Sequence, residues 1–358
     1  MSGNLVFLAG NRALSLIRDG GLGPDLVRVI AGAAGGPKWL VLSHLDRAVF
    51  GTWLTRRDEP LFLLGSSIGA WRFAAACRTN PLAAIEQFEH EYIHQSYSLA
   101  PTPDEVTRET WRIQKAILTE EAVREILDHR FLRLNVLAVR CRRLLGRDDR
   151  YLLGFGLGLA ALVNLISRRG LKLFFERSLF SDPRDVPPFF NMSGFPIQKT
   201  PLGADNIRPA LVASGSIPLV MRGVAGVPGA RPGVYRDGAL IDYHLDLPLL
   251  NDGNGIALYP HFSERLIPGW FDKKLPWRRP SPANLDHALL VAPSRDFMEK
   301  LPLGRLPDRE DFQTFKGRDR ERIFYWSTIV ELCERLGDEF LETTATGRIR
   351  EVVRPLFP

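Results

Sequence analysis

Cysteine is scarce in this chain. Its 358 residues include three cysteines, Cys77, Cys141 and Cys333, an odd number with no C-x-x-C pair. They suggest neither a disulfide framework nor a thiolate zinc site, and they favour a reducing compartment. The N-terminal residues carry no basic stretch before an apolar run and no small-residue cleavage pattern, so we expect no signal peptide and a cytoplasmic location.

Internal repeats and low-complexity tracts are also lacking, which argues against a solenoid or a linker array. Hydrophobic residues make up 45% of the chain and charged residues 25%. This composition is typical of a globular protein and excludes a disordered chain, a collagen-like chain and a polytopic membrane protein. We expect a single catalytic domain over residues 1–358.

Short apolar runs that end in glycine turns alternate with helical patterns. Runs that indicate strands occupy residues 26–31, 61–64, 134–139, 211–214, 255–260 and 287–293. Helical spacing follows Pro37 and continues through residues 81–98 and 104–127. This alternation predicts an α/β fold with a mainly parallel central sheet covered by helices.

The sequence Gly65-Ser66-Ser67-Ile68-Gly69 is a G-x-S-x-G motif between a predicted strand and a predicted helix. In this context the central serine of such a motif stands on a sharp turn with its hydroxyl exposed, and the glycines avoid collisions with strand and helix. Ser67 is therefore the candidate nucleophile, beside a helix N-terminus that stabilises an oxyanion. The alternative is a connecting turn without chemistry.

A second glycine turn, Gly35-Gly36-Pro37-Lys38, also lies between a predicted strand and a predicted helix. Its spacing fits neither a Walker phosphate loop nor a dinucleotide-binding fingerprint, so we expect no nucleotide cofactor. Gly35 and Gly36 instead offer backbone N–H donors for an oxyanion hole, because no side chain blocks them. A plain structural turn is the alternative.

A serine nucleophile needs a base to accept its proton. Asp237, in Asp237-Gly238-Ala239, follows a loop rich in glycine and proline, where small neighbours permit close approach of another backbone. The other candidates for this base are His261 and His287, in a Ser-His-Asp triad.

The sequence His90-Glu-Tyr-Ile-His94 satisfies the five-residue pattern of a zinc protease. Its polar surroundings and the lack of a third ligand at a suitable spacing favour a solvated helix face, so we expect no metal.

Three segments resemble, in their order along the chain, the three motifs of the patatin-like phospholipase family. They are Gly35–Lys38, Gly65–Gly69 and Asp237–Ala239. The segment Ala213–Pro218 resembles the family's small-residue segment ahead of the aspartate. The resemblance covers about residues 24–250, and it implies a patatin-like three-layer fold and a catalytic reaction without a cofactor. Trp39 stands where the family commonly has glycine.

This resemblance implies a Ser–Asp dyad with no catalytic histidine. Ser67 would attack the acyl ester of a phospholipid or lysophospholipid, and Asp237 would act as general base. Gly35 and Gly36 would hold the oxyanion, with Lys38 at the position of the family's basic residue.

Basic residues are concentrated between Arg140 and Arg177, where nine basic and three acidic residues carry an excess equal to the chain's net charge of +6. Residues 151–166 within this segment are uncharged but too few to span a bilayer. Residues 162–180 continue as an amphipathic pattern, so we expect residues 140–190 to be an inserted lid or membrane-docking segment on an anionic surface. The alternative is a core helix with a basic rim.

In a second patch, Trp270, Phe271 and Trp277 alternate with basic residues, which predicts a further interaction surface. Stacking of these rings on nucleic-acid bases is the less favoured interpretation of this patch. We therefore expect a lipid acyl ester as substrate, reversible association with the inner membrane surface, and no nucleic-acid partner. The alternatives are an esterase with a catalytic histidine and a non-catalytic membrane-binding protein.

Overall fold

In the computed structural model, which describes residues 3–250 and 253–357, eleven strands form one sheet. The strands are β1 (Leu5–Ala9), β2 (Val27–Gly32), β3 (Leu61–Ser66), β4 (Leu132–Cys141), β5 (Phe175–Ser181), β6 (Ile197–Pro201), β7 (Val224–Ala225), β8 (Val234–Asp237), β9 (Ile256–Pro260), β10 (Ala288–Pro293) and β11 (Arg354–Pro355). Nine of them run in the order β11-β1-β10-β9-β2-β3-β4-β5-β6, with β8 beside β4 and β7 beside β8. The central strands β10, β9, β2, β3 and β4 are parallel, so the predicted mainly parallel sheet is confirmed.

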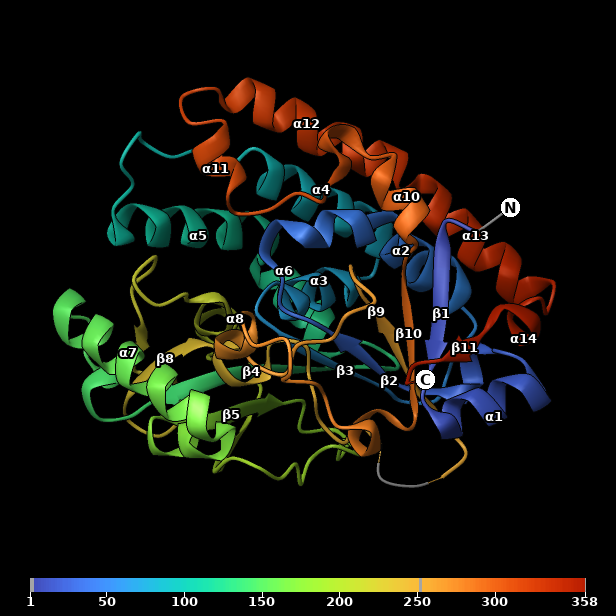
Figure 1. The fold of residues 1–358 in the computed structure, drawn as a ribbon, viewed down its shortest axis with the longest axis horizontal. Coiled ribbons are helices and arrows are strands. Elements are labelled where there is room, and N and C mark those ends of the chain that lie inside the picture. The colour runs from blue at the N-terminus through green and yellow to red at the C-terminus, as the bar shows by residue number, and fades with distance from the viewer. Residues whose placement is uncertain (1–2, 251–252, 358) are drawn as a thin grey trace.

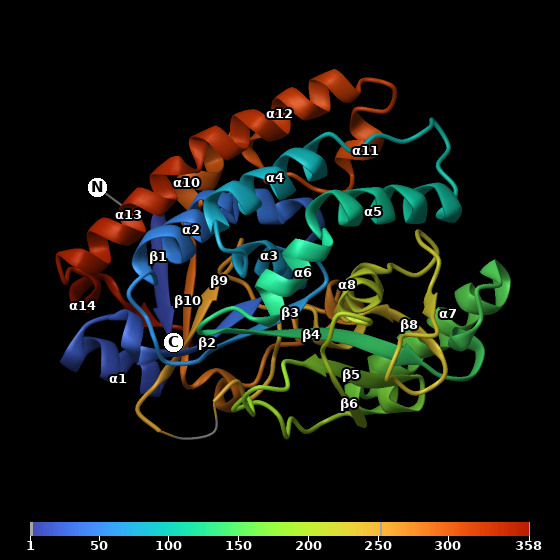
Figure 2. The same ribbon diagram turned by 180° about the vertical axis from the view of Figure 1, so that it is seen from behind.

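Helices flank this sheet on both sides. They are α1 (Asn11–Gly20), α2 (Ser43–Ala48), α3 (Ile68–Ala76), α4 (Pro81–Ile93), α5 (Pro103–Ile117), α6 (Glu120–Leu127), α7 (Arg150–Ile166), α8 (Ile207–Gly215), α9 (Ala239–Asp242), α10 (Arg295–Glu299), α11 (Asp311–Thr314), α12 (Asp319–Leu332), α13 (Glu334–Ala345) and α14 (Ile349–Val352). In Figures 1 and 2, α2, α4, α12 and α13 lie above the sheet, α1 lies below it, and α7 lies at the end of the sheet near β8. The predicted α/β architecture with three layers is therefore confirmed.

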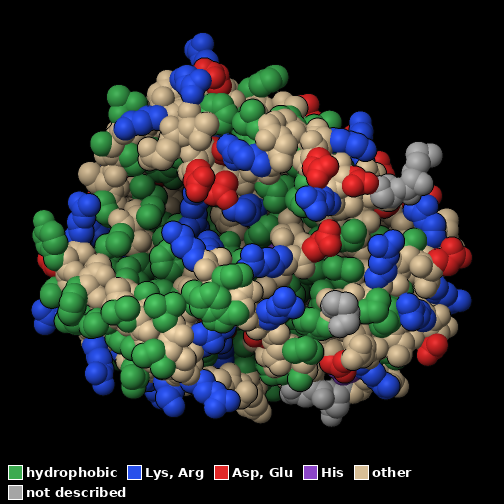
Figure 3. Space-filling view, viewed as in Figure 1, with side chains coloured by type: hydrophobic (Ala, Val, Ile, Leu, Met, Phe, Trp, Pro, Cys, Tyr) green, Lys and Arg blue, Asp and Glu red, His purple; other side chains and the backbone are tan. Residues whose placement is uncertain are grey.

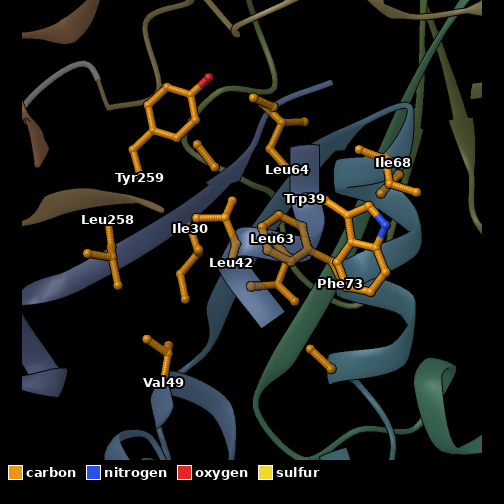
Figure 4. Packing of buried hydrophobic residues seen from close by; sticks show 14 of the residues in the cluster. Ile30, Trp39, Leu42, Val49, Leu63, Leu64, Ile68, Phe73, Leu258 and Tyr259 are labelled. Carbon is orange, nitrogen blue, oxygen red and sulfur yellow. The ribbon is translucent and has the colours of Figure 1, made fainter. Parts of the chain in front are cut away.

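The central strands are apolar on both faces because helices cover both faces. Leu63 and Leu64 of β3, Ile30 of β2 and Leu258 of β9 have no exposed surface. Figure 4 shows Leu63 next to Phe73 of α3, with Ile30 between Leu63 and Leu258. This packing holds the turn between β3 and α3 rigidly at the centre of the sheet.

One prediction about secondary structure in this part of the chain is wrong, and one is refined. Residues 211–214, predicted as a strand, belong to helix α8. The prediction failed because a short apolar run is equally typical of a buried helix and of a buried strand. The helical pattern over residues 104–127 is confirmed, with a short break between α5 and α6. Thr119 begins α6 there, because its side chain accepts a hydrogen bond from the backbone N–H of Ala122.

The amphipathic helix expected over residues 162–180 is also wrong. Helix α7 ends at Ile166, a 3₁₀ helix spans Arg168–Leu173, and β5 follows as a fully buried strand paired with β4. The hydrogen bonds of the sheet outweigh the local helical spacing there. Glu176 of β5 is buried and pairs with Arg140, Arg142 and Arg231.

Within the described part of the chain, no helix combines the length and the apolar character needed to cross a bilayer. Helix α7, which contains the uncharged run, has 17 residues. Residues 140–190 include the end of β4 and all of β5 besides α7, so they contribute to the central sheet as well as to its periphery.

Candidate active site

The sheet register brings Ser67 and Asp237 together although 170 positions separate them. Strands β3 and β8 both pair with β4, β3 running parallel to it and β8 antiparallel. Ser66 at the end of β3 is opposite Leu137, and Asp237 at the end of β8 is opposite the next residue, Ala138. The carboxyl ends of β3 and β8 therefore meet head to head along β4.

Ser67 stands on a strained turn between β3 and α3. Its backbone φ of 55° and ψ of −129° are unfavourable for a residue with a side chain, at a cost of about 1–3 kcal/mol. A Cβ at Gly69 would collide with the carbonyl oxygen of Gly32, and one at Gly65 would collide with Ala70. Both predicted glycines are thus needed for the close contact of β2, β3 and α3.

The two side chains form a buried hydrogen-bonded pair. The hydroxyl of Ser67 donates to Oδ2 of Asp237 at 2.9 Å, and the backbone N–H of Ala239 donates to Oδ1 at 2.9 Å. Burial raises the pKa of Asp237 above its ordinary value of 3.8, although nearby Arg309 and both hydrogen bonds act in the opposite direction. A raised pKa makes the carboxylate a stronger base toward the serine proton.

Candidate donors for an oxyanion come from the Gly35-Gly36 turn and from the start of α3, which follows Ser67. Gly36 lines the same cavity as Ser67, and within the described chain the N–H groups of Gly35 and Gly36 donate to no other residue. The first N–H groups of α3 also lack acceptors inside the helix. The N–H of Ser67 itself is already used, because it donates to the Ser214 hydroxyl at 2.8 Å.

Lys38 is not brought into this cavity. Its ammonium pairs with Asp308 and lines a separate surface depression. Burial, followed by the charge of Arg309, lowers the pKa of Lys38 to about 8. Among the described residues, no direct contact between Lys38 and Ser67 supports the predicted role of Lys38 at an oxyanion hole.

The two candidate histidines lie apart from the nucleophile. Nδ1 of His287 lies 2.9 Å from the carbonyl oxygen of Gly255, and Nδ1 of His261 contacts Ser263. Burial lowers the pKa of His261 to about 3. Among the residues that the structure describes, the hydrogen-bond partner of the Ser67 hydroxyl is a carboxylate and not an imidazole.

The exposed rings of His90, on α4, and His94, at its end, are in contact, with centroids 4.1 Å apart and planes tilted by 31°. Nδ1 of His94 lies 2.8 Å from the carbonyl oxygen of His90. Over residues 3–250 and 253–357, no group of three or more histidine, cysteine, aspartate or glutamate side chains is arranged to hold a metal ion.

A cavity of about 310 Å³ opens from Ser67. Its walls come from α4, α5, the loop after α8, and α11, and most of the side chains are apolar. The lining includes Tyr92, Val106, Ile113, Ile217, Val220, Met221 and Phe312. Figure 3 shows the molecule hollowed between the positions of α5 and α8, with Lys and Arg side chains gathered beside the hollow.

The sequence motifs assign no role to two residues at the site, Ser214 and Arg309. Ser214 fixes the turn, since its hydroxyl accepts from the Ser67 N–H and donates to the carbonyl oxygen of Leu137 at 2.6 Å. The small-residue segment Ala213–Pro218 was the sequence feature that could have indicated this role of Ser214. Arg309, which lines the cavity with Ser67, comes from a loop far along the chain, and no motif marks it.

A scan against models of known protein families finds no match to this chain, and a search of the curated proteins finds none either.

Proposed function

We propose that this protein is a patatin-like serine acyl hydrolase that cleaves acyl esters of phospholipids or lysophospholipids through a covalent acyl-enzyme on Ser67. The observation that carries the proposal is the 2.9 Å hydrogen bond from the Ser67 hydroxyl to Asp237, made on a turn with positive φ. Backbone strain of this kind persists where surrounding packing enforces it, and such positions cluster at active sites.

The geometry supports a two-step reaction. Asp237 accepts the hydroxyl proton on Oδ2 as the Ser67 oxygen attacks the ester carbonyl, and the new oxyanion faces the N–H groups of Gly35, Gly36 and the start of α3. The protonated Asp237 then gives its proton to the leaving alcohol. In the second step Asp237 takes a proton from water, which attacks the acyl-enzyme carbonyl. The bond to the Ser67 oxygen then breaks, Asp237 returns the proton to that oxygen, and the fatty acid is released.

The apolar cavity supports a lipid acyl chain as the part of the substrate next to the ester. Burying an apolar chain contributes about 0.8 kcal/mol per methylene group. Trp71 and Ile113 line this space together with Ser67 itself, so a chain held there has its carbonyl beside the nucleophile.

Labelling with a fluorophosphonate probe tests the covalent step. We expect wild-type protein to gain one probe adduct, located on Ser67 by peptide mass spectrometry, and Ser67→Ala to gain none. Ser66→Ala is the matched control, because Ser66 is the adjacent buried serine in β3 and keeps the nucleophile. An unlabelled wild type, or equal labelling of Ser67→Ala, would refute the proposal.

A separate observation concerns the outer face of α7. Leu153 and Leu157 on its inner face pack in a hydrophobic cluster with Phe175 of β5. The outer face is apolar as well: Phe155 is 62% exposed and Ile166 is 89% exposed. Tyr151, Leu162 and Leu165 extend this face at helical spacing. A helix in water normally has a polar outer face, so a contiguous apolar one indicates an interaction surface.

Unpaired cations surround this face. Within the described chain, five exposed basic residues before, at the start of and after α7 have no ion-pair partner: Arg143, Arg147, Arg150, Arg169 and Lys172. Figure 3 shows hydrophobic side chains over the position of α7 with basic ones at the margins. Arg168, by contrast, pairs with buried Asp272 and does not serve this surface.

We infer that α7 rests on an anionic bilayer, because its apolar face and cationic margin complement lipid tails and negative headgroups. The start of α7 is fixed beside the loop after α8, since the backbone N–H of Gly223 donates to Asp148. In that loop Leu219 and Val220 are exposed, and Val220 also lines the cavity. Docking through α7 therefore brings the cavity mouth toward the lipid.

Vesicle flotation tests this inference. We expect binding to vesicles containing phosphatidylglycerol, weaker binding at high salt, and about tenfold weaker binding for Phe155→Ser with Leu162→Ser or for Arg169→Gln with Lys172→Gln. Phe324→Ser is the control, because Phe324 is 75% exposed on α12, on the other side of the molecule from α7. Equal binding to neutral vesicles, or binding unchanged by both pairs of substitutions, would overturn the inference.

A further inference from the structure

Two cations from loops late in the chain flank the catalytic pair. Arg309 lines the main cavity together with Ser67, and it also lines a small adjoining recess together with Asp237. Its guanidinium lies against the oxyanion loop, since a Cβ built on Gly36 would be 2.9 Å from Nε of Arg309. Arg309 therefore stands where the reacting end of a bound ester would lie.

Lys273 approaches the same recess from the loop after β9. Its Nζ lies 4.2 Å from the ring centroid of Tyr243, and Tyr243 lines the recess with Asp237 and Arg309. The charges of both Lys273 and Arg309 act on Asp237. The two cations thus converge on the catalytic carboxylate from different elements.

Neither cation has an acidic partner in the part of the chain that the structure describes. The neighbouring charges are otherwise matched, because Lys38 pairs with Asp308, and Arg305 pairs with Asp311. Two positive groups therefore face one buried carboxylate, so the site carries an excess of positive charge. A partly buried guanidinium without an ion pair is stabilised by an anion that accepts its hydrogen bonds.

We propose that Arg309 and Lys273 form a subsite for a phosphate group on the substrate, next to the ester that Ser67 attacks. This assignment rests on the proposed hydrolase function and specifies its substrate as a phosphate-bearing acyl ester. Arg309 binds two phosphate oxygens through its planar donors, while Lys273 contributes a point charge. The apolar cavity then holds the acyl chain, and the phosphate lies on the Arg309 side of the carbonyl.

A matched pair of soluble substrates tests the subsite: 1-butyrylglycerol and 1-butyrylglycerol 3-phosphate. We expect wild-type protein to have the higher kcat/KM for the phosphate ester. Arg309→Gln and Lys273→Gln should lower the ratio of the two kcat/KM values about tenfold or more, mainly through KM, because each removes a charge-assisted contact. Arg320→Gln on α12 is the control, since it removes a positive charge, unpaired within the described residues, from an exposed position that lines neither the cavity nor the recess, and it should keep the wild-type ratio.

Two kinetic results would overturn the proposal. One is a wild-type ratio near one, and the other is an equal loss of kcat on both esters in Arg309→Gln, which would place Arg309 in the ester chemistry itself. Inorganic phosphate should also inhibit competitively, and less so in the variants.

A binding measurement separates this proposal from the hydrolase function. If wild-type protein hydrolyses neither ester, the hydrolase function has failed, and stabilisation by inorganic phosphate still tests the subsite. Phosphate should raise the melting temperature of wild-type protein and not that of the Arg309→Gln, Lys273→Gln double variant. Equal stabilisation of both proteins, or of neither, would refute the subsite.

Discussion

The substitution Asp237→Asn removes the proposed base while keeping the shape of the site. The backbone N–H of Ala239 needs an acceptor, so the amide oxygen of the new asparagine takes the place of Oδ1. The amide NH₂ then faces the Ser67 hydroxyl in place of Oδ2 and donates to it, so no group remains to accept the serine proton. General-base catalysis contributes roughly 10²–10⁴ in rate, so we expect kcat to fall by that factor, or about 3–5 kcal/mol in the barrier.

The pH dependence follows from the same carboxylate. Asp237 works only when ionised, and burial raises its pKa above the ordinary 3.8. The kcat/KM of wild-type protein should therefore fall about tenfold per pH unit below that raised pKa, and Asp237→Asn should show no such limb. A double variant with Ser67→Ala should be no slower than Ser67→Ala alone, since the two groups act as a unit.

Initial rates with p-nitrophenyl butyrate from about pH 4 to about pH 8 measure these effects. His287→Gln is the control, because its ring contacts the Gly255 carbonyl and should leave the rate within about threefold. Asp237→Asn with at least a tenth of wild-type kcat would refute the reasoning. Loss of activity in His287→Gln, with a pH limb in the imidazole range, would instead support a triad.

Three further predictions concern stability. Gly69→Ala should destabilise the fold by several kcal/mol and abolish probe labelling, because its Cβ meets the Gly32 carbonyl oxygen; Gly154→Ala on α7, where a Cβ meets nothing within 4 Å, should raise stability by up to about 1 kcal/mol. If both alanines behaved alike in urea unfolding, the close contact at the elbow would be disproved. Asp242→Asn should cost about 3–5 kcal/mol because it strands the buried Arg177 guanidinium, whereas Asp58→Asn in an exposed pair should cost less than about 1 kcal/mol; similar costs for the two would contradict this account. The raised pKa of Asp237 means that the folded state binds this proton more tightly than the unfolded state, so its contribution to stability is present below the ordinary pKa and lost as pH rises through the raised one. Asp237→Asn should therefore have the higher melting temperature at neutral pH and lose that advantage in acid, and a lower melting temperature at neutral pH would count against the burial argument.

Local patterns predicted the elements that form the site. The runs before Gly32 and Gly65 are strands β2 and β3, and helix α3 follows Ser67 as the motif required. These predictions succeeded because each depends on neighbours in the chain: an apolar run, a residue without a Cβ, and a helix-forming segment. The prediction failed in residues 211–214, because the same local pattern is compatible with a strand and with a helix. It also failed where residues with helical spacing pair with β4 and form strand β5.

The sequence alone could not show which of the basic residues lie at the site. Lys38 is adjacent to the oxyanion loop in the chain, yet Asp308 holds it away from the cavity that Ser67 lines. Arg309 is the neighbour of Asp308, and it occupies the cavity in place of Lys38. Which cation reaches a site depends on ion pairing between distant loops, and spacing along one segment does not contain that information.

The amino-acid sequence by itself determined the α/β alternation, the glycines that permit the Ser67 turn, and the uncharged length of α7, because periodicity and the lack of a Cβ act over a few residues. Tertiary structure alone decided that Asp237 meets Ser67, that one face of α7 stays uncovered, and that Arg309 stands beside the nucleophile. Those outcomes depend on which strands pair along β4 and how the loops pack above them, and both are set by the burial of the whole chain.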